Sequence, residues 1–238
     1  MSGSPLSNPS ATKLRVGGLT RLSTCDWPGE LSAVVFCQGC AWDCTYCHNP
    51  GLRTMHAETF ILWPEILAFL QSRRGLLDAV VFSGGEPTLQ PALLDAVHAV
   101  RDLGFRVGLH TAGITPERFE ALLPWIDWVG FDVKAPFGAY ARITGVDGSG
   151  DKALASLRLL LTSGIPYEVR TTFHPALLTL ADLIELRDQL LSLGVTHDVI
   201  QQFRAAGTRE GRLLPLPEQQ QLNLPSSYGS GFLEFHVR

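Results

Sequence analysis

The sequence predicts an α/β protein built on a mainly parallel β-sheet, and three observations support this fold class. Short apolar or β-branched runs alternate with segments of helical periodicity along most of the 238 residues. Hydrophobic residues make up 45% of the chain and charged residues 18%, which suffices for one buried core. Polar residues gather directly after several predicted strands, where parallel α/β folds place their active sites.

The alternation places six strands at 33–36, 77–82, 106–109, 128–133, 167–172 and 198–203, with a possible edge strand at 232–237. Helices are expected between them at 64–71, 91–103, 116–123, 152–162 and 180–193. Pro64 suits the first turn of its helix, and Gly104, Gly164 and Gly194 end theirs. The alternation alone fits either an open doubly wound sheet or a barrel.

The chain is expected to form one domain at 14–238 after a flexible N-terminal tail at 1–13. The stretch 207–231, which is rich in proline and glutamine, is expected to form a long loop region. No apolar run approaches the ~20 residues of a membrane span, so we expect a cytoplasmic protein without a membrane partner. The net charge of -4 argues against a nucleic-acid partner, because phosphate binding needs concentrated positive charge.

The five cysteines stand at positions 25, 37, 40, 44 and 47, and four of them fall within eleven residues. Disulfide frameworks usually use an even number of cysteines, so this crowding indicates metal ligation in a reducing compartment. Cys40, Cys44 and Cys47 have the spacing C-x3-C-x2-C, with which three thiolates can wrap one iron–sulfur cluster. On a four-iron cluster, three thiolates leave one iron open to a substrate.

The alternative is a structural zinc site made by Cys37, Cys40, Cys44 and Cys47, in a non-catalytic interaction module. Zinc accepts four thiolates, but its structural sites usually join two knuckles across a longer loop. The iron–sulfur interpretation instead leaves Cys37 as a buried strand-end residue. Cys25 is then a small core or surface thiol.

The cysteine spacing, followed by Ser83-Gly84-Gly85-Glu86-Pro87, resembles the radical S-adenosylmethionine (SAM) superfamily. The stretches Cys25-Asp26-Trp27-Pro28-Gly29 and Tyr46-Cys47-His48-Asn49-Pro50 are similar to activases of glycyl radical enzymes. The branch they resemble most is the activating protein of anaerobic ribonucleoside-triphosphate reductase. The resemblance spans residues 19–204 and implies a partial (β/α)6 TIM-like barrel. Six units rather than eight would leave a lateral opening that suits a macromolecular substrate.

The resemblance implies an oxidoreductase with two cofactors, SAM and one [4Fe-4S] cluster held by Cys40, Cys44 and Cys47. One electron would cleave SAM into methionine and a 5′-deoxyadenosyl radical, which would take a hydrogen from a backbone glycine of the partner. The implied partners are a glycyl radical enzyme, here anaerobic ribonucleotide reductase, and a reductant such as flavodoxin or ferredoxin. The alternatives are an activase of the pyruvate formate-lyase type and a small-molecule radical SAM enzyme.

The resemblance also assigns SAM contacts to residues near the ends of the predicted strands. They are Tyr46, Gly84, Gly85, Glu86, Thr111, Asp132, Lys134, Arg170 and Thr172. Gly84 and Gly85 would meet the SAM amino group, because glycine lets a backbone approach a ligand closely. Glu86 would support that loop, and Tyr46 would pack at the adenine. The alternative for Gly84 and Gly85 is that they only form an ordinary turn before a helix that begins with proline.

Lys134 is implied to pair with the SAM carboxylate, with Asp132 holding the lysine or a nearby cation. Arg170 is implied to contact ribose or carboxylate oxygens, and its alternative is an ion pair with Glu168. His110 stands where the family commonly has aspartate, which leaves open the monovalent-cation site of some activases. Two further predictions concern neighbouring residues. His48 is expected to support the loop, and Gln201, Gln202 and Arg204 to line the adenine pocket or the partner groove.

Overall fold

The chain folds around one eight-stranded sheet in the order β1-β2-β3-β4-β5-β6-β7-β8. The computed structural model describes residues 11–56, 60–209, 213 and 222–238. The first strand, β1 (Val16–Ser23), runs antiparallel to β2 (Ser32–Cys37). All later neighbours are parallel. They are β3 (Ala79–Gly84), β4 (Arg106–Thr111), β5 (Trp128–Asp132), β6 (Tyr167–Phe173), β7 (His197–Gln202) and β8 (Glu234–Val237).

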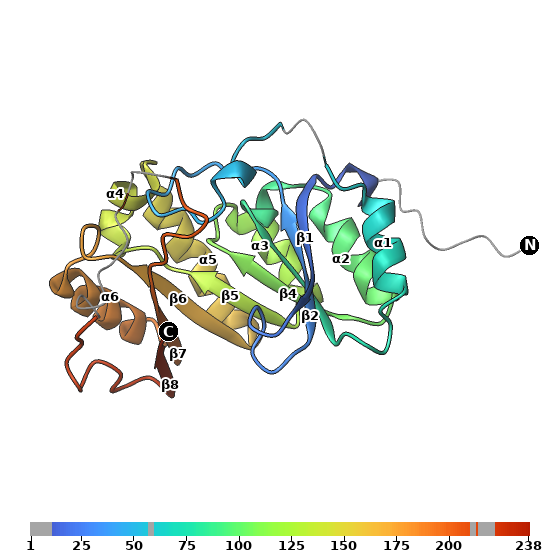
Figure 1. The fold of residues 1–238 in the computed structure, drawn as a ribbon. Helices are drawn as coiled ribbons and strands as arrows, with labels where there is room; N and C mark the ends of the chain where they lie inside the picture. The colour runs from blue at the N-terminus through green and yellow to red at the C-terminus, as the bar shows by residue number, and fades with distance from the viewer. Residues whose placement is uncertain (1–10, 57–59, 210–212, 214–221) are drawn as a thin grey trace, which may run out of the picture.

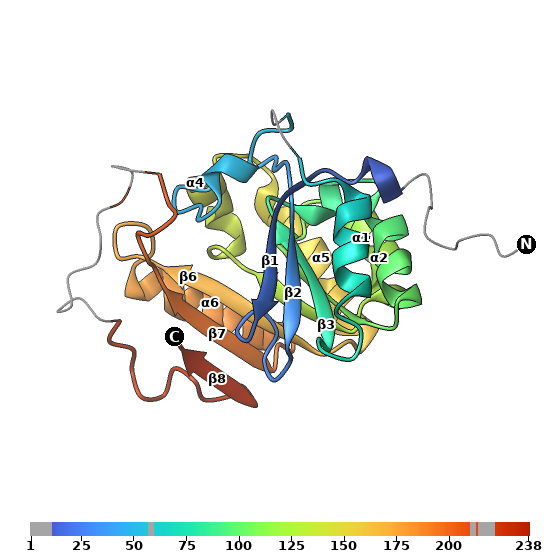
Figure 2. The same cartoon turned by 45° about the vertical axis from the view of Figure 1, so that its right-hand side comes forward.

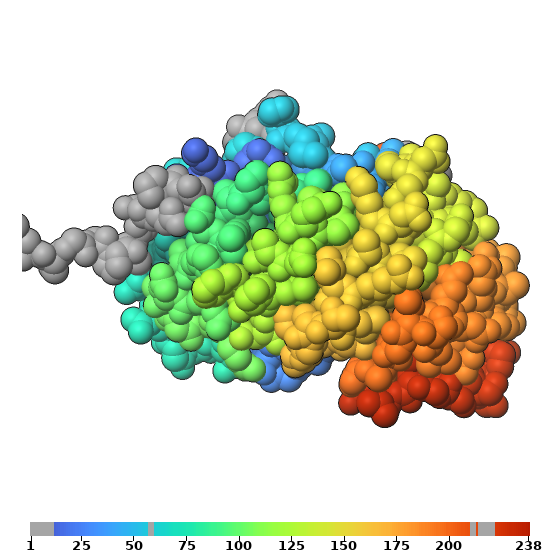
Figure 3. Space-filling view, turned by 180° about the vertical axis from the view of Figure 1, so that it is seen from behind, coloured from blue at the N-terminus to red at the C-terminus, as the bar shows by residue number. Residues whose placement is uncertain are grey.

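Helices cover one face of this curved sheet, as Figures 1 and 2 show. They are α1 (Trp63–Gln71), α2 (Leu93–Asp102), α3 (Pro116–Leu122), α4 (Tyr140–Thr144), α5 (Ser149–Ser163) and α6 (Leu180–Ser192). Short 3-10 helices are η1 (Ala11–Lys13), η2 (Pro50–Leu52), η3 (Pro87–Leu89), η4 (Leu123–Trp125) and η5 (Phe137–Ala139). Seen from behind, the helical segments follow one another across this outer face (Figure 3). The α/β class and the TIM-like partial barrel are therefore confirmed.

Three details differ from the expectation. The strand β1 was not predicted, because Gly17 and Gly18 interrupt its apolar pattern. Gly17 is needed there, since a Cβ would lie 2.3 Å from Oε1 of Gln38. The five-residue α4 is too short to show helical periodicity. Among the described residues, no helix follows β7 before β8, so the sixth strand-helix unit of the implied (β/α)6 barrel has no helix there.

Two apolar clusters lie on opposite faces of the sheet because side chains alternate along each strand. The larger cluster lies between the sheet and the helices and includes Val35 of β2. The smaller cluster, on the other face, consists of Trp27, Val34, Ala79, Val81 and Trp128. The rings of Trp27 and Trp128 stack at 5.6 Å, so the loop after β1 folds onto this inner face.

Parts of the expected domain organisation lie outside the described residues. These are residues 1–10 of the expected tail and 210–212 and 214–221 of the expected long loop. The last three residues of the expected tail, Ala11–Lys13, form η1. Among the helices that the structure describes, none has both the length and the apolar character needed to cross a membrane.

Candidate active site

A cavity of about 300 Å³ opens where the parallel strands end, and all twelve residues predicted for the site line it. These are Cys40, Cys44, Tyr46, Cys47, Gly84, Gly85, Glu86, Thr111, Asp132, Lys134, Arg170 and Thr172. They come from the ends of four strands, β3 to β6, and from the loop after β2. The parallel topology brings them together, since the carboxyl ends of parallel strands meet at one edge of the sheet.

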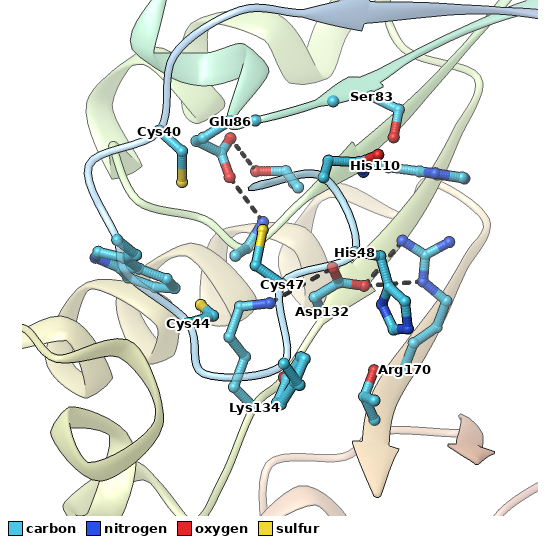
Figure 4. A pocket seen from close by; sticks show the side chains of 18 of the residues that line it. Cys40, Cys44, Cys47, His48, Ser83, Glu86, His110, Asp132, Lys134 and Arg170 are labelled. Atoms are coloured by element: carbon cyan, nitrogen blue, oxygen red, sulfur yellow. Dashed lines mark hydrogen bonds and ion pairs between the residues drawn. The ribbon is translucent and has the colours of Figure 1, made fainter. Parts of the chain in front are cut away.

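The cysteine loop is held by backbone hydrogen bonds from two directions. The Cys40 amide donates to the carbonyl of Arg53 at 3.0 Å, on the returning arm of the loop. The Asp43 amide donates to the carbonyl of Thr144 at 2.9 Å, at the end of α4. In Figure 4 the sulfur atoms of Cys40, Cys44 and Cys47 point into the space between them. The loop therefore presents three thiols to one cavity.

The other two cysteines lie elsewhere. Cys37 is fully buried in the larger core cluster at the end of β2, and Cys25 is exposed. Among the described residues, no group of three or more His, Cys, Asp or Glu side chains is compact enough to hold a single metal ion. Cys37 is not among the residues that line the cavity shared by the other three thiols.

Gly84 and Gly85 are required by the cysteine loop itself. Gly84 has a φ of 113°, and a Cβ there would lie 2.5 Å from the backbone N and O of Cys37. A Cβ on Gly85 would lie 2.4 Å from the carbonyl oxygen of Gly39. The Gly85 and Glu86 amides donate to the carbonyls of Cys37 and Gly39, both at 2.9 Å. The two glycines thus let β3 end directly against the cysteine loop.

Glu86 ties the ends of β3 and β4 together. Its carboxylate is 1% exposed and accepts four hydrogen bonds, from the amide and hydroxyl of Thr88, the Thr111 hydroxyl and the Ala112 amide. Burial raises the pKa of Glu86, although these four donors oppose the rise. The Thr111 hydroxyl also accepts from the Gly113 amide at 2.9 Å. The expected supporting role of Glu86 matches this geometry, whereas the Thr111 hydroxyl is already engaged within the protein.

Asp132 lies between two cations at the rim of the cavity (Figure 4). Its carboxylate accepts from Nη2 of Arg170 at 2.9 Å and lies 3.7 Å from Nζ of Lys134. Burial by itself would raise the pKa of Asp132, but Arg170 and Lys134 hold it below its ordinary value. The Lys134 ammonium also lies 5.5 Å from the centre of the Tyr46 ring. The group carries a net positive charge, which suits an anionic ligand group.

Sequence reasoning missed two residues that shape this rim. Gly130 of β5 makes room for Arg170, because a Cβ there would lie 2.6 Å from Nη1 of the guanidinium. Asp26 lines the cavity, and its carbonyl lies 2.7 Å from Nε2 of His110. Asp26 lay inside the motif that carries the resemblance, so a signal for it existed. No sequence signal marked Gly130, because its contact partner, Arg170, lies 40 residues away in sequence.

His110 is an uncharged side chain in this environment. Burial, followed by the nearby Arg170, lowers its pKa to about 3. Since a carbonyl oxygen only accepts, Nε2 carries the proton of the neutral ring and donates to Asp26. Of the other neighbours expected here, Gln202 and Arg204 are not among the residues that line the cavity. His48 and Gln201 line the cavity, and Nε2 of His48 lies 3.0 Å from the carbonyl of Arg204.

Comparisons with known proteins agree with this geometry. The sequence model of the radical SAM superfamily matches residues 34–190. A Methanocaldococcus jannaschii protein, provisionally named a glycyl-radical enzyme activating enzyme, is 33% identical over 88% of this chain and 89% of its own. A pyruvate formate-lyase-activating enzyme of Streptococcus mutans is 31% identical over 81% of this chain and 78% of its own. Streptococcus suis SuiB, solved with bound SAM, has a TM-score of 0.58 and 15% identity over 74% of this chain and 40% of SuiB.

The cofactors of this superfamily are a [4Fe-4S] cluster and SAM, and the cavity has donors for both. Three cysteines from one loop suit an iron–sulfur cluster that keeps one open iron. Burial raises the pKa of the Cys40 thiol to about 12, so its thiolate needs a neighbouring cation such as iron. The cations Lys134 and Arg170 line the same cavity as the thiols, where they suit the carboxylate of SAM.

Proposed function

We propose that this chain, which belongs to the radical SAM superfamily, activates a glycyl radical enzyme. The observation that carries the proposal is the similarity to an activating enzyme over 88% of this chain and 89% of that relative. We further propose that residues 14–238 act as one radical SAM domain.

The chain's own residues would hold the cofactors in the following way. Cys40, Cys44 and Cys47 would bind the cluster, and SAM would occupy the rest of the cavity. When bound, the cluster supplies one electron that cleaves SAM to methionine and a 5′-deoxyadenosyl radical, which takes a hydrogen atom from a glycine of the partner. Lys134 and Arg170 would bind the SAM carboxylate and its neighbouring oxygens.

The remaining assignments concern shape and shielding. Tyr46 would pack against the adenine, and the Gly84–Gly85 backbone would meet the SAM amino group. Glu86 and Thr111 would keep the ends of β3 and β4 together around SAM. Thr172 keeps its predicted role as a SAM contact. The buried side chains that line the cavity would limit the access of water to a reactive radical.

We propose anaerobic ribonucleoside-triphosphate reductase as the partner, with flavodoxin or ferredoxin as the reductant. The support is the motif similarity at Cys25-Asp26-Trp27-Pro28-Gly29 and Tyr46-Cys47-His48-Asn49-Pro50. A pyruvate formate-lyase-type partner is the second candidate. It is supported by the 31% identity to the Streptococcus mutans activating enzyme.

The test is a glycyl radical signal in electron paramagnetic resonance. The anaerobically reconstituted chain is mixed with SAM, dithionite and either the reductase or pyruvate formate-lyase. A doublet on the reductase alone supports the first partner, and a doublet on the lyase alone supports the second. SAM cleavage without a doublet on either enzyme would reject both partners and favour a small-molecule substrate. Cys40→Ala, Cys44→Ala and Cys47→Ala should each abolish SAM cleavage, whereas the control Cys25→Ala should not.

A further inference from the structure

Three charged side chains, Asp43, Arg53 and Arg209, form an ion triad on the cysteine loop. Asp43, which lies between Cys40 and Cys44 in the sequence, receives two guanidinium groups at the same oxygen. Oδ1 of Asp43 is 2.9 Å from Nη1 of Arg53 and 3.3 Å from Nη1 of Arg209. The three side chains are 22–42% exposed, so solvent screens these contacts only in part.

The two arginines come from different parts of the chain. Arg53 lies on the returning arm of the loop, where its Nε donates to the carbonyl of Trp42 at 3.0 Å. Arg209 follows β7, far along the chain. The segment 203–209 runs beside the loop, because His48 contacts the Arg204 carbonyl at 3.0 Å. The site for a Cβ on Gly207 is 3.0 Å from the carbonyl oxygen of His48. The segment after β7 therefore packs against the cysteine loop and contacts it at Asp43 and His48.

The charges of this triad act on any group that the loop holds. An aspartate directly before one of the proposed cluster ligands, Cys44, opposes the addition of an electron to the cluster. Two guanidinium groups on that aspartate more than neutralise it, and the reduction potential of an iron–sulfur cluster depends on such nearby charge. A fixed ion pair at one end of the loop also limits the movement of the cysteines.

We propose that Arg53 and Arg209 are positioning residues that act through Asp43, holding the cysteine loop and raising the reduction potential of its cluster. The proposal rests on the cluster of the superfamily and is independent of the glycyl radical partner. No residue of the triad enters the SAM cavity, so the effect is one of charge and loop order.

The experiment compares Arg209→Gln with the wild-type full chain after anaerobic reconstitution. The midpoint potential of the cluster is measured by a redox titration without SAM, and iron loss to a chelator is followed by absorbance. We expect a more negative potential and iron loss about two- to fivefold faster, the range typical of a partly exposed ion pair. Arg209→Lys keeps the charge and should recover most of the potential.

Two further variants separate the triad from general effects. Arg204→Gln removes a charge from the same segment but leaves the Arg204 carbonyl beside His48, so it should change the potential less than Arg209→Gln. In an Asp43→Asn background, the effect of Arg209→Gln should shrink, because the shared partner is gone. Unchanged potential and iron loss in Arg209→Gln would overturn the proposal, as would an equal effect of Arg204→Gln. Neither readout involves a partner enzyme, so its failure is distinguishable from a failure of the proposed function.

Discussion

Carboxyl groups are buried both at the cavity rim and in the outer strand β7, and the two regions surround them differently. At the rim, Glu86 accepts four hydrogen bonds, and Asp132 lies between Arg170 and Lys134. In β7, Asp198 is 1% exposed, and neither carboxylate oxygen has a hydrogen-bond partner among the described residues. Burial raises the pKa of Asp198 to about 7, whereas the pKa of Asp132 is lowered.

The difference follows from what packs around each group. In the sheet register, Asp198 pairs with Val169 of β6 and Phe235 of β8. Burial raises the pKa of the Tyr228 phenol, and the nearby Asp198 adds to that rise. These neighbours offer no cation to the carboxylate, so the neutral acid is favoured. The rim thus holds fixed charges that can meet a charged ligand, and β7 holds a carboxyl group that changes charge near neutral pH.

The largest effect is expected for Glu86→Ala at the rim. The change leaves the buried donors of Thr88, Thr111 and Ala112 without an acceptor. We expect a loss of about 3 kcal/mol in the free energy of unfolding, measured by urea titration. Glu86→Gln keeps one acceptor oxygen and should lose less. Equal urea midpoints for wild type and Glu86→Ala would show that the rim does not depend on this carboxylate.

Lys134→Met tests whether the rim charges serve a ligand. Because a charge-assisted hydrogen bond contributes about 1.5–3 kcal/mol, SAM affinity should fall roughly ten- to hundredfold. The affinity of the reconstituted protein is measured by equilibrium dialysis. Lys152→Met, on the surface of α5, is the control and should bind SAM as the wild type does. An unchanged affinity in Lys134→Met would remove this lysine from the SAM site.

Asp198→Asn tests the other side of the comparison. The pKa of Asp198 is 3.8 without the protein environment and about 7 in the fold, so the folded state holds its proton more tightly. The stability from Asp198 is therefore complete below about pH 4, falls as the pH rises, and is lost above about pH 7. The isosteric amide cannot ionise, and should therefore stabilise the protein at pH 8 and have little effect at pH 4. Urea midpoints at several pH values check this, and a constant difference between variant and wild type would contradict it.

The smallest effect on stability is expected for Gly130→Ala. Its Cβ would meet the end of the flexible Arg170 side chain, which can move, so we expect a loss below about 1 kcal/mol. SAM affinity should nevertheless fall, because the guanidinium would shift within the cavity while it stays paired with Asp132. Gly108→Ala is the matched comparison, since its Cβ would lie 2.9 Å from the rigid Trp27 ring. That variant should lose about 1–3 kcal/mol, and a smaller loss than in Gly130→Ala would contradict the packing argument.

Much of the fold and the membership of the site were predictable because they depend on local patterns. Apolar runs and helical periodicity located the strands β2 to β7 and the longer helices within a few residues. The cysteine spacing and the Gly84–Gly85 turn marked the site, and the strand ends supplied the remaining residues. Parallel topology then places all these residues at one edge, so naming the strands was enough to name the cavity lining.

The contacts within the site were not predictable in this way, because their partners lie far apart in the sequence. The pairing of Arg170 with Asp132 joins residues 38 positions apart, and His48 meets Arg204 across 156 positions. The glycines show the same limit. Sequence reasoning explained Gly84 and Gly85 by the approach of a ligand, whereas in the fold their missing side chains make room for the cysteine loop.

The sequence by itself determined the fold class, the three candidate cluster ligands and the set of residues at the cavity, because spacing and periodicity are local properties. Only the tertiary structure decided which charges are paired, which hydroxyl is already engaged and which buried acid lacks a partner. Those outcomes depend on distances between separate strands and loops. The pKa values of Asp132 and Asp198 move in opposite directions for that reason, although both are aspartates in strands of the same sheet.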